Sequence, residues 1–210
     1  MIKVGIDYSL ISPAICIQKD NEYIFISFFD THGKDWQKSK AKTFHYHQEL
    51  SEIMELIPYN RGIDNSDYRT EQKTKMKSAK MMSNLISSKI KEIVGDNQVI
   101  IGIEGFSYNS MSSATLDLAL YNSFLRIKLL ETFGDDCIVI ISPTEGKKTL
   151  FGKGNAKKDD MIKSFIDNRL GDDELTKTPL WKYCTSKGLD YNNIKPIDDL
   201  VDSYAILKSI

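Results

Sequence analysis

Cysteine and histidine are scarce in this sequence. The 210 residues include 3 of each, and Cys16, Cys137 and Cys184 lie far apart, without the paired spacing of a zinc site or a disulfide framework. Cys16 and Cys137 fall inside apolar runs, where cysteine usually packs as a small hydrophobic side chain. We therefore expect no disulfide framework, no zinc centre and no cysteine nucleophile.

The sequence also lacks long hydrophobic stretches. Its longest apolar runs, such as residues 99–101 and 137–141, are far too short to cross a bilayer. Met1 leads directly into a strand-like pattern, without the basic region, apolar region and cleavage site of a secretory leader. These features predict a cytoplasmic protein with no membrane partner.

Neither sign of charge is in excess, because 28 basic and 29 acidic residues give a net charge of −1. The lysines are nevertheless clustered. One cluster consists of Lys73, Lys75, Lys77 and Lys80. The other consists of Lys147, Lys148, Lys153, Lys157 and Lys158. Local charge matters more than net charge for polyanion binding, so the clusters are compatible with a nucleic-acid partner, although a lysine cluster is more often a solvated helix face.

Hydrophobic patterning predicts alternating blocks of strands and helices. The predicted strands lie at residues 2–9, 14–18, 23–29, 99–104 and 137–142. The predicted helices lie at residues 39–56, 72–94, 113–133, 157–170 and 197–208, with short ones starting at Pro143 and near residue 180. Residues 58–70 are polar and turn-rich, so we expect a loop there.

The order of these elements predicts an α/β fold, formed by a single domain over residues 1–210. Short links between the first three strands favour an antiparallel meander, and helical crossovers to the later strands favour parallel pairing. We therefore expect a mixed five-stranded sheet with helices on both faces. Two helical stripes are expected to face the core. On 72–94 this stripe is Met76, Ala79, Met82, Ile86 and Ile90, and on 113–133 it is Leu116, Ala119, Leu120, Phe124, Ile127 and Leu130.

Two apolar strands end with a carboxylate two residues after a glycine. Residues 4–7 read Val-Gly-Ile-Asp, and residues 101–104 read Ile-Gly-Ile-Glu. Strand alternation places each glycine on the same face as its carboxylate, and glycine leaves room there for close approach by another group. A charged carboxylate at the end of a buried strand is costly unless it is paired or bound to metal. Asp7 and Glu104 are therefore candidate metal ligands.

The last predicted helix supplies further acids. Asp199 and Asp202 are three residues apart and project from the same helix face. Helix N-termini favour acids in any case, which is an ordinary explanation for Asp198 and Asp199 but a weaker one for Asp202. Two-metal phosphoryl chemistry needs carboxylates that hold two ions about 3.5–4 Å apart. Convergence of the three elements, which spacing alone leaves open, would create such a site from Asp7, Glu104, Asp199 and Asp202.

Four segments resemble the RuvC-type Holliday-junction resolvases of the RNase H-like superfamily, in the order that this family has them. Residues 2–9 (IKVGIDYS) are similar to its opening acidic strand, and residues 100–106 (IIGIEGF) to its second acidic strand. Residues 142–148 and 152–158 are similar to its proline-led helix and its G-x-G-x-A-x-K segment. Residues 196–205 (PIDDLVDSYA) are similar to its final D-x-x-D-A helix.

This resemblance implies an RNase H-like fold and a crossover junction endodeoxyribonuclease, which would cut branched DNA such as a four-way (Holliday) junction during recombination or repair. Its catalytic and metal-binding acids would be Asp7, Glu104, Asp199 and Asp202, with two Mg²⁺ ions, or Mn²⁺, as cofactors. Lys158 stands where the family has a lysine that could steady phosphate charge. A four-way junction presents two symmetric strands, so a homodimer is expected.

Contacts to DNA are expected from the second lysine cluster, namely Lys147, Lys148, Lys153, Lys157 and Lys158. The family's base-engaging aromatic is replaced by Ser107, but Phe106 and Tyr108 flank it and are candidate stacking residues. Residues 8–12 also depart from the family's small glycine-containing turn. These departures fit a viral or phage member, which would act in the cytoplasm of an infected host cell instead of a bacterial cell.

Three other functions are compatible with parts of the sequence. An RNase H-like nuclease that acts on RNA–DNA hybrids would need the same acids. A branched-DNA-binding protein that has lost catalysis would keep the fold, although the presence of all four acids argues against it. A sugar-kinase-like ATPase would need a second glycine-rich phosphate segment, which we do not find.

Overall fold

The described part of the chain forms one mixed six-stranded sheet in the order β4-β3-β2-β1-β5-β6. The computed structural model describes residues 1–31, 50–106, 113–187 and 195–210. The strands are β1 (Ile2–Asp7), β2 (Ala14–Lys19), β3 (Glu22–Asp30), β4 (Glu55–Tyr59), β5 (Val99–Glu104) and β6 (Ile138–Ile141). The first three form the predicted antiparallel meander, and β5 pairs parallel to both β1 and β6. The predicted mixed α/β class is confirmed, with one strand more than expected.

The additional strand is β4, which pairs parallel to β3 at the edge of the sheet. Residues 55–56 were predicted to end a helix and residues 58–59 to begin a loop, and both predictions are wrong. Proline is tolerated on an edge strand, so Pro58 does not interrupt the pairing. The predicted helical residues 39–49 lie outside the described part of the chain.

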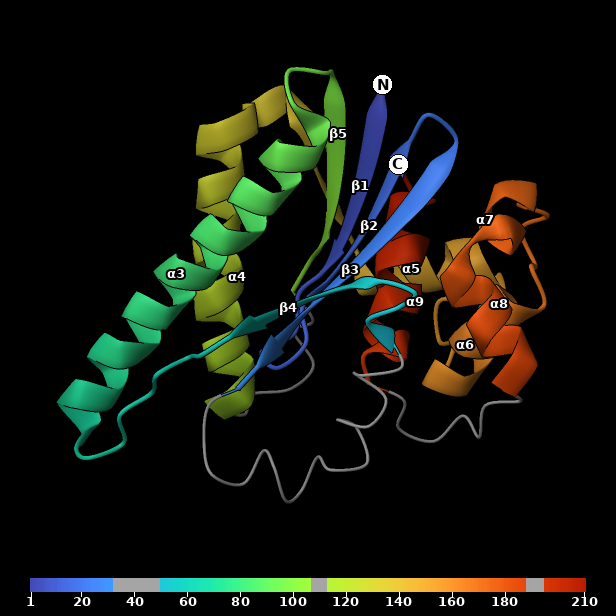
Figure 1. The fold of residues 1–210 in the computed structure, drawn as a ribbon. Coiled ribbons are helices and arrows are strands. Elements are labelled where there is room, and N and C mark those ends of the chain that lie inside the picture. Colours follow the sequence, from blue (N-terminus) through green and yellow to red (C-terminus); the bar gives the residue numbers. More distant parts are fainter. Residues whose placement is uncertain (32–49, 107–112, 188–194) are drawn as a thin grey trace.

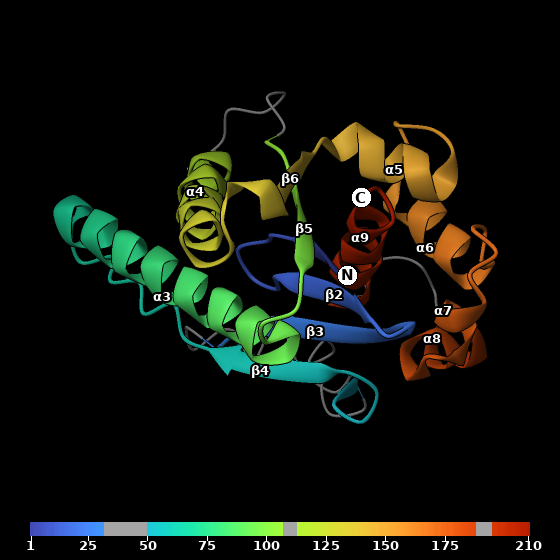
Figure 2. The ribbon, with the colours of Figure 1, turned by 90° about the horizontal axis from the view of Figure 1, so that it is seen from above.

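Helices cover both faces of the sheet, as predicted (Figures 1 and 2). One face carries α3 (Tyr68–Val94) and α4 (Ser113–Phe133). The other carries α5 (Pro143–Phe151), α6 (Lys158–Ile166), α7 (Asp173–Lys177), α8 (Pro179–Lys187) and α9 (Ile197–Leu207). A short 3₁₀ turn, η1 (Asp135–Cys137), precedes β6. Within the described ranges, no helix is long and apolar enough to cross a membrane.

The helix on residues 68–94 begins four residues earlier than predicted, because Asp67 caps it. The Asp67 carboxylate accepts hydrogen bonds from the backbone N–H groups of Arg69 and Thr70, at 2.9 and 3.1 Å. Most of its predicted core stripe is buried, but Met76 is 51% exposed. The core therefore begins one turn further along α3, at Ser78 and Ala79.

The predicted inward face of α4 is right for Leu120 and Phe124, which pack against the core, but wrong for Leu116, Ile127 and Leu130, which are exposed. Tyr121, Leu125 and Leu129 are the apolar residues that α4 buries against the sheet. Leu116 is 65% exposed and Ile127 is 56% exposed. This helix is apolar on more than one side, so periodicity could not identify the side that meets the sheet.

A single carboxylate, Asp172, links the turn before α7 to β3 and to the C-terminal end of α9. Asp172 accepts hydrogen bonds from the Tyr23 and Tyr204 hydroxyls, at 2.5 and 2.9 Å, and from Lys208 Nζ at 3.0 Å. Partial burial opposes ionisation, but these donors hold the pKa of Asp172 at about 2. The carboxylate thus joins β3, the turn before α7 and the C-terminal end of α9.

Close packing between β1 and α9 depends on Gly5. A Cβ atom at this position would lie 2.1 Å from the Ser203 carbonyl oxygen and 2.5 Å from the Leu207 backbone nitrogen. Both atoms belong to the helix backbone, so a side chain could be accommodated only by moving α9 away from the sheet. Gly102 on the neighbouring strand also faces α9, and a Cβ there would lie 3.0 Å from Ile206.

We expect Gly5→Ala to lower the free energy of unfolding by about 3 kcal/mol or more, because the new methyl group would displace the backbone of α9. Gly146→Ala is the matched control. Its Cβ would meet nothing closer than 3.9 Å, and Gly146 lies within helix α5, so we expect no loss of stability. Urea denaturation of both variants tests this, and similar midpoints would contradict it.

Candidate metal-dependent active site

A pocket of about 430 Å³ lies at the carboxyl ends of β1 and β5. The parallel register pairs Ile6 with Ile103, so Asp7 and Glu104 end neighbouring strands side by side. Helix α9 begins at the same end of the sheet and contributes Asp199 and Asp202 to the pocket. All four predicted acids therefore line one pocket, together with Lys158. The convergence that spacing left open is observed.

Burial and mutual repulsion oppose ionisation of these acids. Burial raises the pKa of Asp7 well above its usual value, and repulsion by Asp199, Asp202 and Glu104 raises it further. The pKa of Asp202 rises to about 7 for the same reasons. Burial also raises the pKa values of Glu104 and Asp199, although nearby lysines oppose this. The pocket thus concentrates negative charge that lacks full compensation within the protein.

Two lysines supply part of that compensation. Asp198 and Asp199 are buried at the start of α9, with exposed fractions of 5% and 3%. Lys195 forms ion pairs with both, and Lys158 forms an ion pair with Asp198. Asp198 Oδ1 has no hydrogen-bond partner among the described residues. Neither acid is the N-cap, which is Pro196, but both lie in the first turn of α9, where the helix dipole favours acids as expected.

Sequence reasoning missed two contributors to the site. Lys195 precedes Asp198 and Asp199 by three and four residues, a spacing that could have indicated contact with both side chains. Ser12 is the other. Its hydroxyl donates a hydrogen bond to Asp199, and Ser9 Oγ lies 3.5 Å from the same carboxylate. The turn that departs from the family at residues 8–12 therefore delivers hydroxyl donors to the acids.

The predicted DNA contacts lie around the pocket with different degrees of support. Lys147 is close enough to lower the pKa of Glu104. Lys148, Lys153 and Lys157 are exposed on α5 and on the segment before α6, outside the pocket lining. The Arg126 guanidinium lies 4.2 Å from the centroid of the Phe106 ring, just after β5. Tyr108 lies outside the described residues.

The donor set fits hard divalent cations such as Mg²⁺ or Mn²⁺. It consists of carboxylates in a pocket that opens to solvent, and their pKa values are raised first by burial and then by mutual repulsion, which a divalent cation would relieve. In the conformation observed, no three His, Cys, Asp or Glu side chains of the described ranges are close enough together to hold one ion. In this conformation the Lys195 ammonium group forms an ion pair with the Asp199 carboxylate, at a position that a cation would otherwise neutralise.

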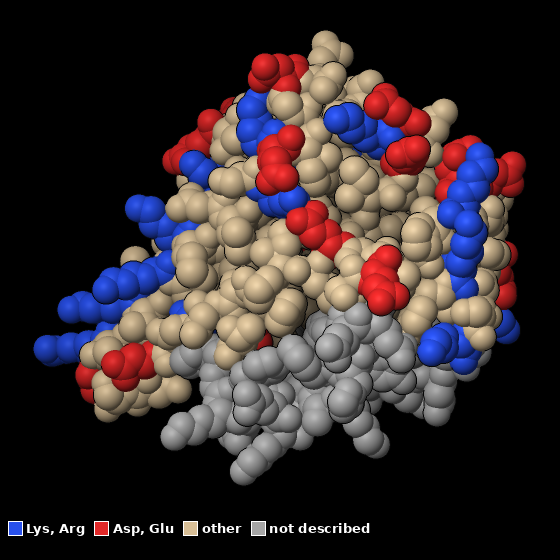
Figure 3. Space-filling model, viewed as in Figure 1, with Lys and Arg blue, Asp and Glu red and all other residues tan. Residues whose placement is uncertain are grey.

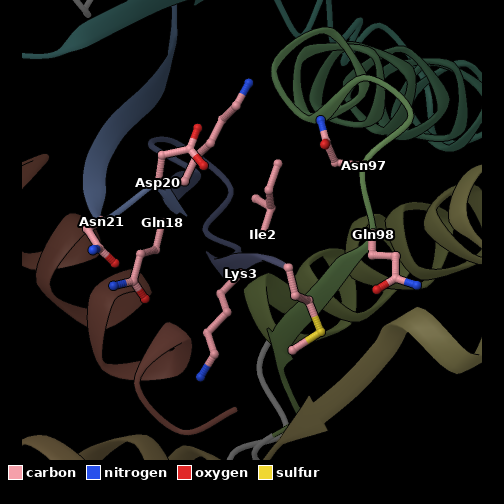
Figure 4. Close-up of a pocket in the computed structure, with 9 residues that line it drawn as sticks. Ile2, Lys3, Gln18, Asp20, Asn21, Asn97 and Gln98 are labelled. Atoms are coloured by element: carbon pink, nitrogen blue, oxygen red, sulfur yellow. The ribbon is translucent and has the colours of Figure 1, made fainter.

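A second pocket, of about 520 Å³, lies at the other end of the central strands (Figure 4). It is lined by the start of β1, the turn between β2 and β3, and the turn before β5. Asp20 is its only acidic residue among the described residues, and most of its other polar groups are amides, such as Gln18, Asn21, Asn97 and Gln98. This pocket offers no cluster of acids for metal-dependent chemistry.

Comparison with known proteins yields structural relatives only. No protein-family model matches the sequence, and no relative is detected among curated proteins. The yeast mitochondrial Holliday junction resolvase Ydc2 superposes over 99% of this chain and 76% of its own, with a TM-score of 0.53 and 16% identity. The fold is that of the RuvC-type resolvases.

Two structures of RuvC from Thermus thermophilus are also found as similar structures. One is RuvC itself and the other is its complex with a Holliday junction substrate. Each covers 100% of this chain and 92% of its own, with a TM-score of 0.46 and identities of 12% and 9% respectively.

We expect Lys195→Met to destabilise the metal-free protein by roughly 1–3 kcal/mol at neutral pH, because Asp198 and Asp199 would lose a counter-ion. This is less than the loss of a fully buried partner, since the Lys195 side chain is 37% exposed. Added Mg²⁺ or Mn²⁺ should then stabilise the variant more than the native protein. Thermal unfolding in EDTA and with each metal measures both effects.

Lys177→Met is the control for this experiment. Lys177 pairs with Glu174 at 2.6 Å on the surface, where its side chain is 65% exposed, so we expect little change. A Lys195→Met protein as stable as the native protein in EDTA, or one that divalent ions do not stabilise further, would contradict the role assigned to Lys195.

Proposed function

We propose that this protein is a Mg²⁺-dependent, structure-selective endonuclease that cuts branched DNA such as four-way junctions. The observation that carries the proposal is the single pocket that collects Asp7, Glu104, Asp199 and Asp202 in a RuvC-type fold. Ydc2, which shares this fold, is named as a Holliday junction resolvase. The sequence motifs around all four acids support the same function.

The four acids would hold two divalent ions, which when bound supply activation of water and stabilisation of charge on the phosphate. Ser12 would orient the Asp199 carboxylate through its hydroxyl. Lys158 pairs with Asp198 at the pocket rim, where its side chain is 62% exposed and can balance phosphate charge. We propose that the exposed Lys148, Lys153 and Lys157 contact the DNA backbone on either side.

Junction cleavage tests this function. A four-way junction in Mg²⁺ should receive nicks near the branch, and a linear duplex of the same sequence should not. We expect Asp7→Asn to lower the cleavage rate at least about a hundredfold, because it removes a charged metal ligand. Asp96→Asn should leave the rate unchanged, because Asp96 is an exposed acid near the other end of the central strands.

Each alternative function has its own result in this experiment. Cutting of an RNA–DNA hybrid but not of the junction would assign a different substrate. Tight junction binding without cutting, in either Mg²⁺ or Mn²⁺, would indicate a binding protein without catalysis. If the protein neither binds nor cuts branched DNA, the proposed function is wrong.

We further propose that the active form is a homodimer joined through α4. Positions 116, 120, 123, 127 and 130 of this helix alternate at intervals of four and three residues, which is the spacing of a two-helix seam. Four of them are apolar, Ser123 is the exception, and Leu120 is partly buried against the chain's own core. Leu116, Ile127 and Leu130 are 65%, 56% and 39% exposed in the single chain. Such an apolar stripe on an outer helix is typical of an interaction surface.

The position of α4 supports a second copy of this chain as the occupant of this stripe. Ala114, Thr115 and Leu118, at the start of the helix, line the acidic pocket. Pairing of two α4 helices would therefore fix the separation and orientation of two pockets. Paired cuts on two symmetric strands require such a fixed relation.

We expect Ile127→Asp to convert the dimer into a folded monomer, because it buries a charge in an apolar seam. Sedimentation velocity measures the mass, and circular dichroism checks the fold. Leu170→Asp is the control, since Leu170 is 36% exposed just after α6, far from α4. A native protein that is monomeric at micromolar concentration, or an Ile127→Asp variant that stays dimeric, would rule out this interface.

A further inference from the structure

The first three turns of α3 form an arm that is not part of the core. None of the residues from Tyr68 to Lys77 is buried, and the buried positions of the helix begin at Ser78. The helix has 27 residues, which corresponds to a length of about 40 Å. Its N-terminal part extends past the sheet at the lower left of Figure 1.

One side of this arm is basic. Arg69, Lys73, Lys77 and Lys80 follow one another at intervals of four, four and three residues, so they lie along the same face of the helix. All four are exposed, and basic side chains extend from the corresponding edge of the molecule in Figure 3. Met76, which we had expected in the core, also lies on this exposed face. We call these four residues the α3 basic face.

The other three lysines of α3 are ion-paired, and the contrast is informative. Lys75 pairs with Glu71 and Asp117, Lys89 with Glu55 and Glu92, and Lys91 with Asp96. The α3 basic face has no acidic partner among the described residues. The nearby acids Asp64 and Asp67 accept hydrogen bonds from backbone N–H groups at the start of the helix. The four positive charges are thus left for an external anion.

The strand directions place the start of α3 at the same end of the sheet as the acidic pocket, where β1, β4 and β5 terminate. Strand β3 is antiparallel to β2 and hence parallel to β1, and β4 is parallel to β3. The carboxyl end of β4 therefore lies at the same end of the sheet as Asp7, which is the last residue of β1. The chain enters α3 from this end of β4, and α3 then runs back towards the start of β5. The start of α4 connects the two, because Thr115 and Leu118 line the pocket and the adjacent Asp117 pairs with Lys75 of the arm.

We propose that the α3 basic face binds the phosphate backbone of a duplex arm of the substrate, at a distance from the branch point. This proposal rests on the proposed function, because it assumes that branched DNA occupies the pocket. The four residues cover about 16 Å along the helix axis. Duplex DNA presents one phosphate charge per about 1.7 Å of its axis, so several phosphates lie within reach of this face. Contacts of this kind add affinity without sequence preference.

The test compares two triple variants that remove the same charge. Lys73→Gln/Lys77→Gln/Lys80→Gln neutralises most of the α3 basic face. Lys91→Gln/Lys163→Gln/Lys182→Gln removes three exposed lysines at the far end of α3, on α6 and on α8. Binding is measured by fluorescence anisotropy in EDTA, with four-way junctions that have either long or short arms, over a range of salt concentrations.

We expect the α3 triple variant to bind the long-armed junction at least about tenfold more weakly than the native protein at low salt. The slope of log K against log salt should fall by about 2–3, because each lost phosphate contact contributes about 0.9. The control triple variant should keep the native slope. On the short-armed junction, the α3 triple variant and the native protein should bind equally. Cleavage at saturating protein should also match the native rate.

Several outcomes would overturn the proposal. Equal losses in the two triple variants would mean that net charge alone matters. If the α3 triple variant loses affinity equally for the long-armed and the short-armed junction, the α3 basic face contacts DNA at the branch point and not along a duplex arm. If the α3 triple variant binds with native affinity, the α3 basic face makes no contact with DNA. If the native protein binds no branched DNA, the proposed function fails instead, so the two failures are distinguishable.

Discussion

The close approach of α9 to β1 is the contact on which the candidate site depends. Because position 5 is glycine, the Ser203 carbonyl and the Leu207 amide can lie directly against the strand. This approach brings the acids of α9 to the strand end that carries Asp7, and Gly102 permits the same approach on the neighbouring strand. Gly5 bears no functional group, yet its missing side chain is what allows the carboxylates to meet. The chemistry of the pocket therefore depends on packing between backbones.

Bringing the carboxylates together creates an electrostatic problem that the chain only partly solves. Burial and repulsion disfavour the ionised forms, as the raised pKa values of Asp7 and Asp202 indicate. Lys195 and Ser12 stabilise Asp199, but no group within the described residues neutralises the whole cluster. The same imbalance that weakens the metal-free protein favours binding of divalent cations. Stability and cation affinity are thus opposed properties of one pocket.

The sequence was most informative where the signal is local. Glycine and acid share one face of each strand, so the pairs at residues 5–7 and 102–104 could be recognised before their convergence was known. β4 was missed because the apolar residues before Pro58 also fit a helical period. The buried face of α4 was partly misassigned because apolar side chains occur on two sides of that helix. Lys195 and Ser12 were missed because their roles depend on tertiary contacts to Asp199.

The Asp172 carboxylate has a mechanical consequence for the site. By joining Tyr23, Tyr204 and Lys208, it clamps the C-terminal end of α9 to β3 and to the turn before α7. Gly5 packs against Ser203 and Leu207 in this same half of the helix, so both sets of contacts hold the C-terminal half of α9 on the sheet. Accommodation of the ions then falls to side-chain rotation and to the Lys195 ammonium at the opposite end. The backbone of α9 thus keeps its acids in fixed positions, and the Lys195 side chain is the group that can move when cations bind.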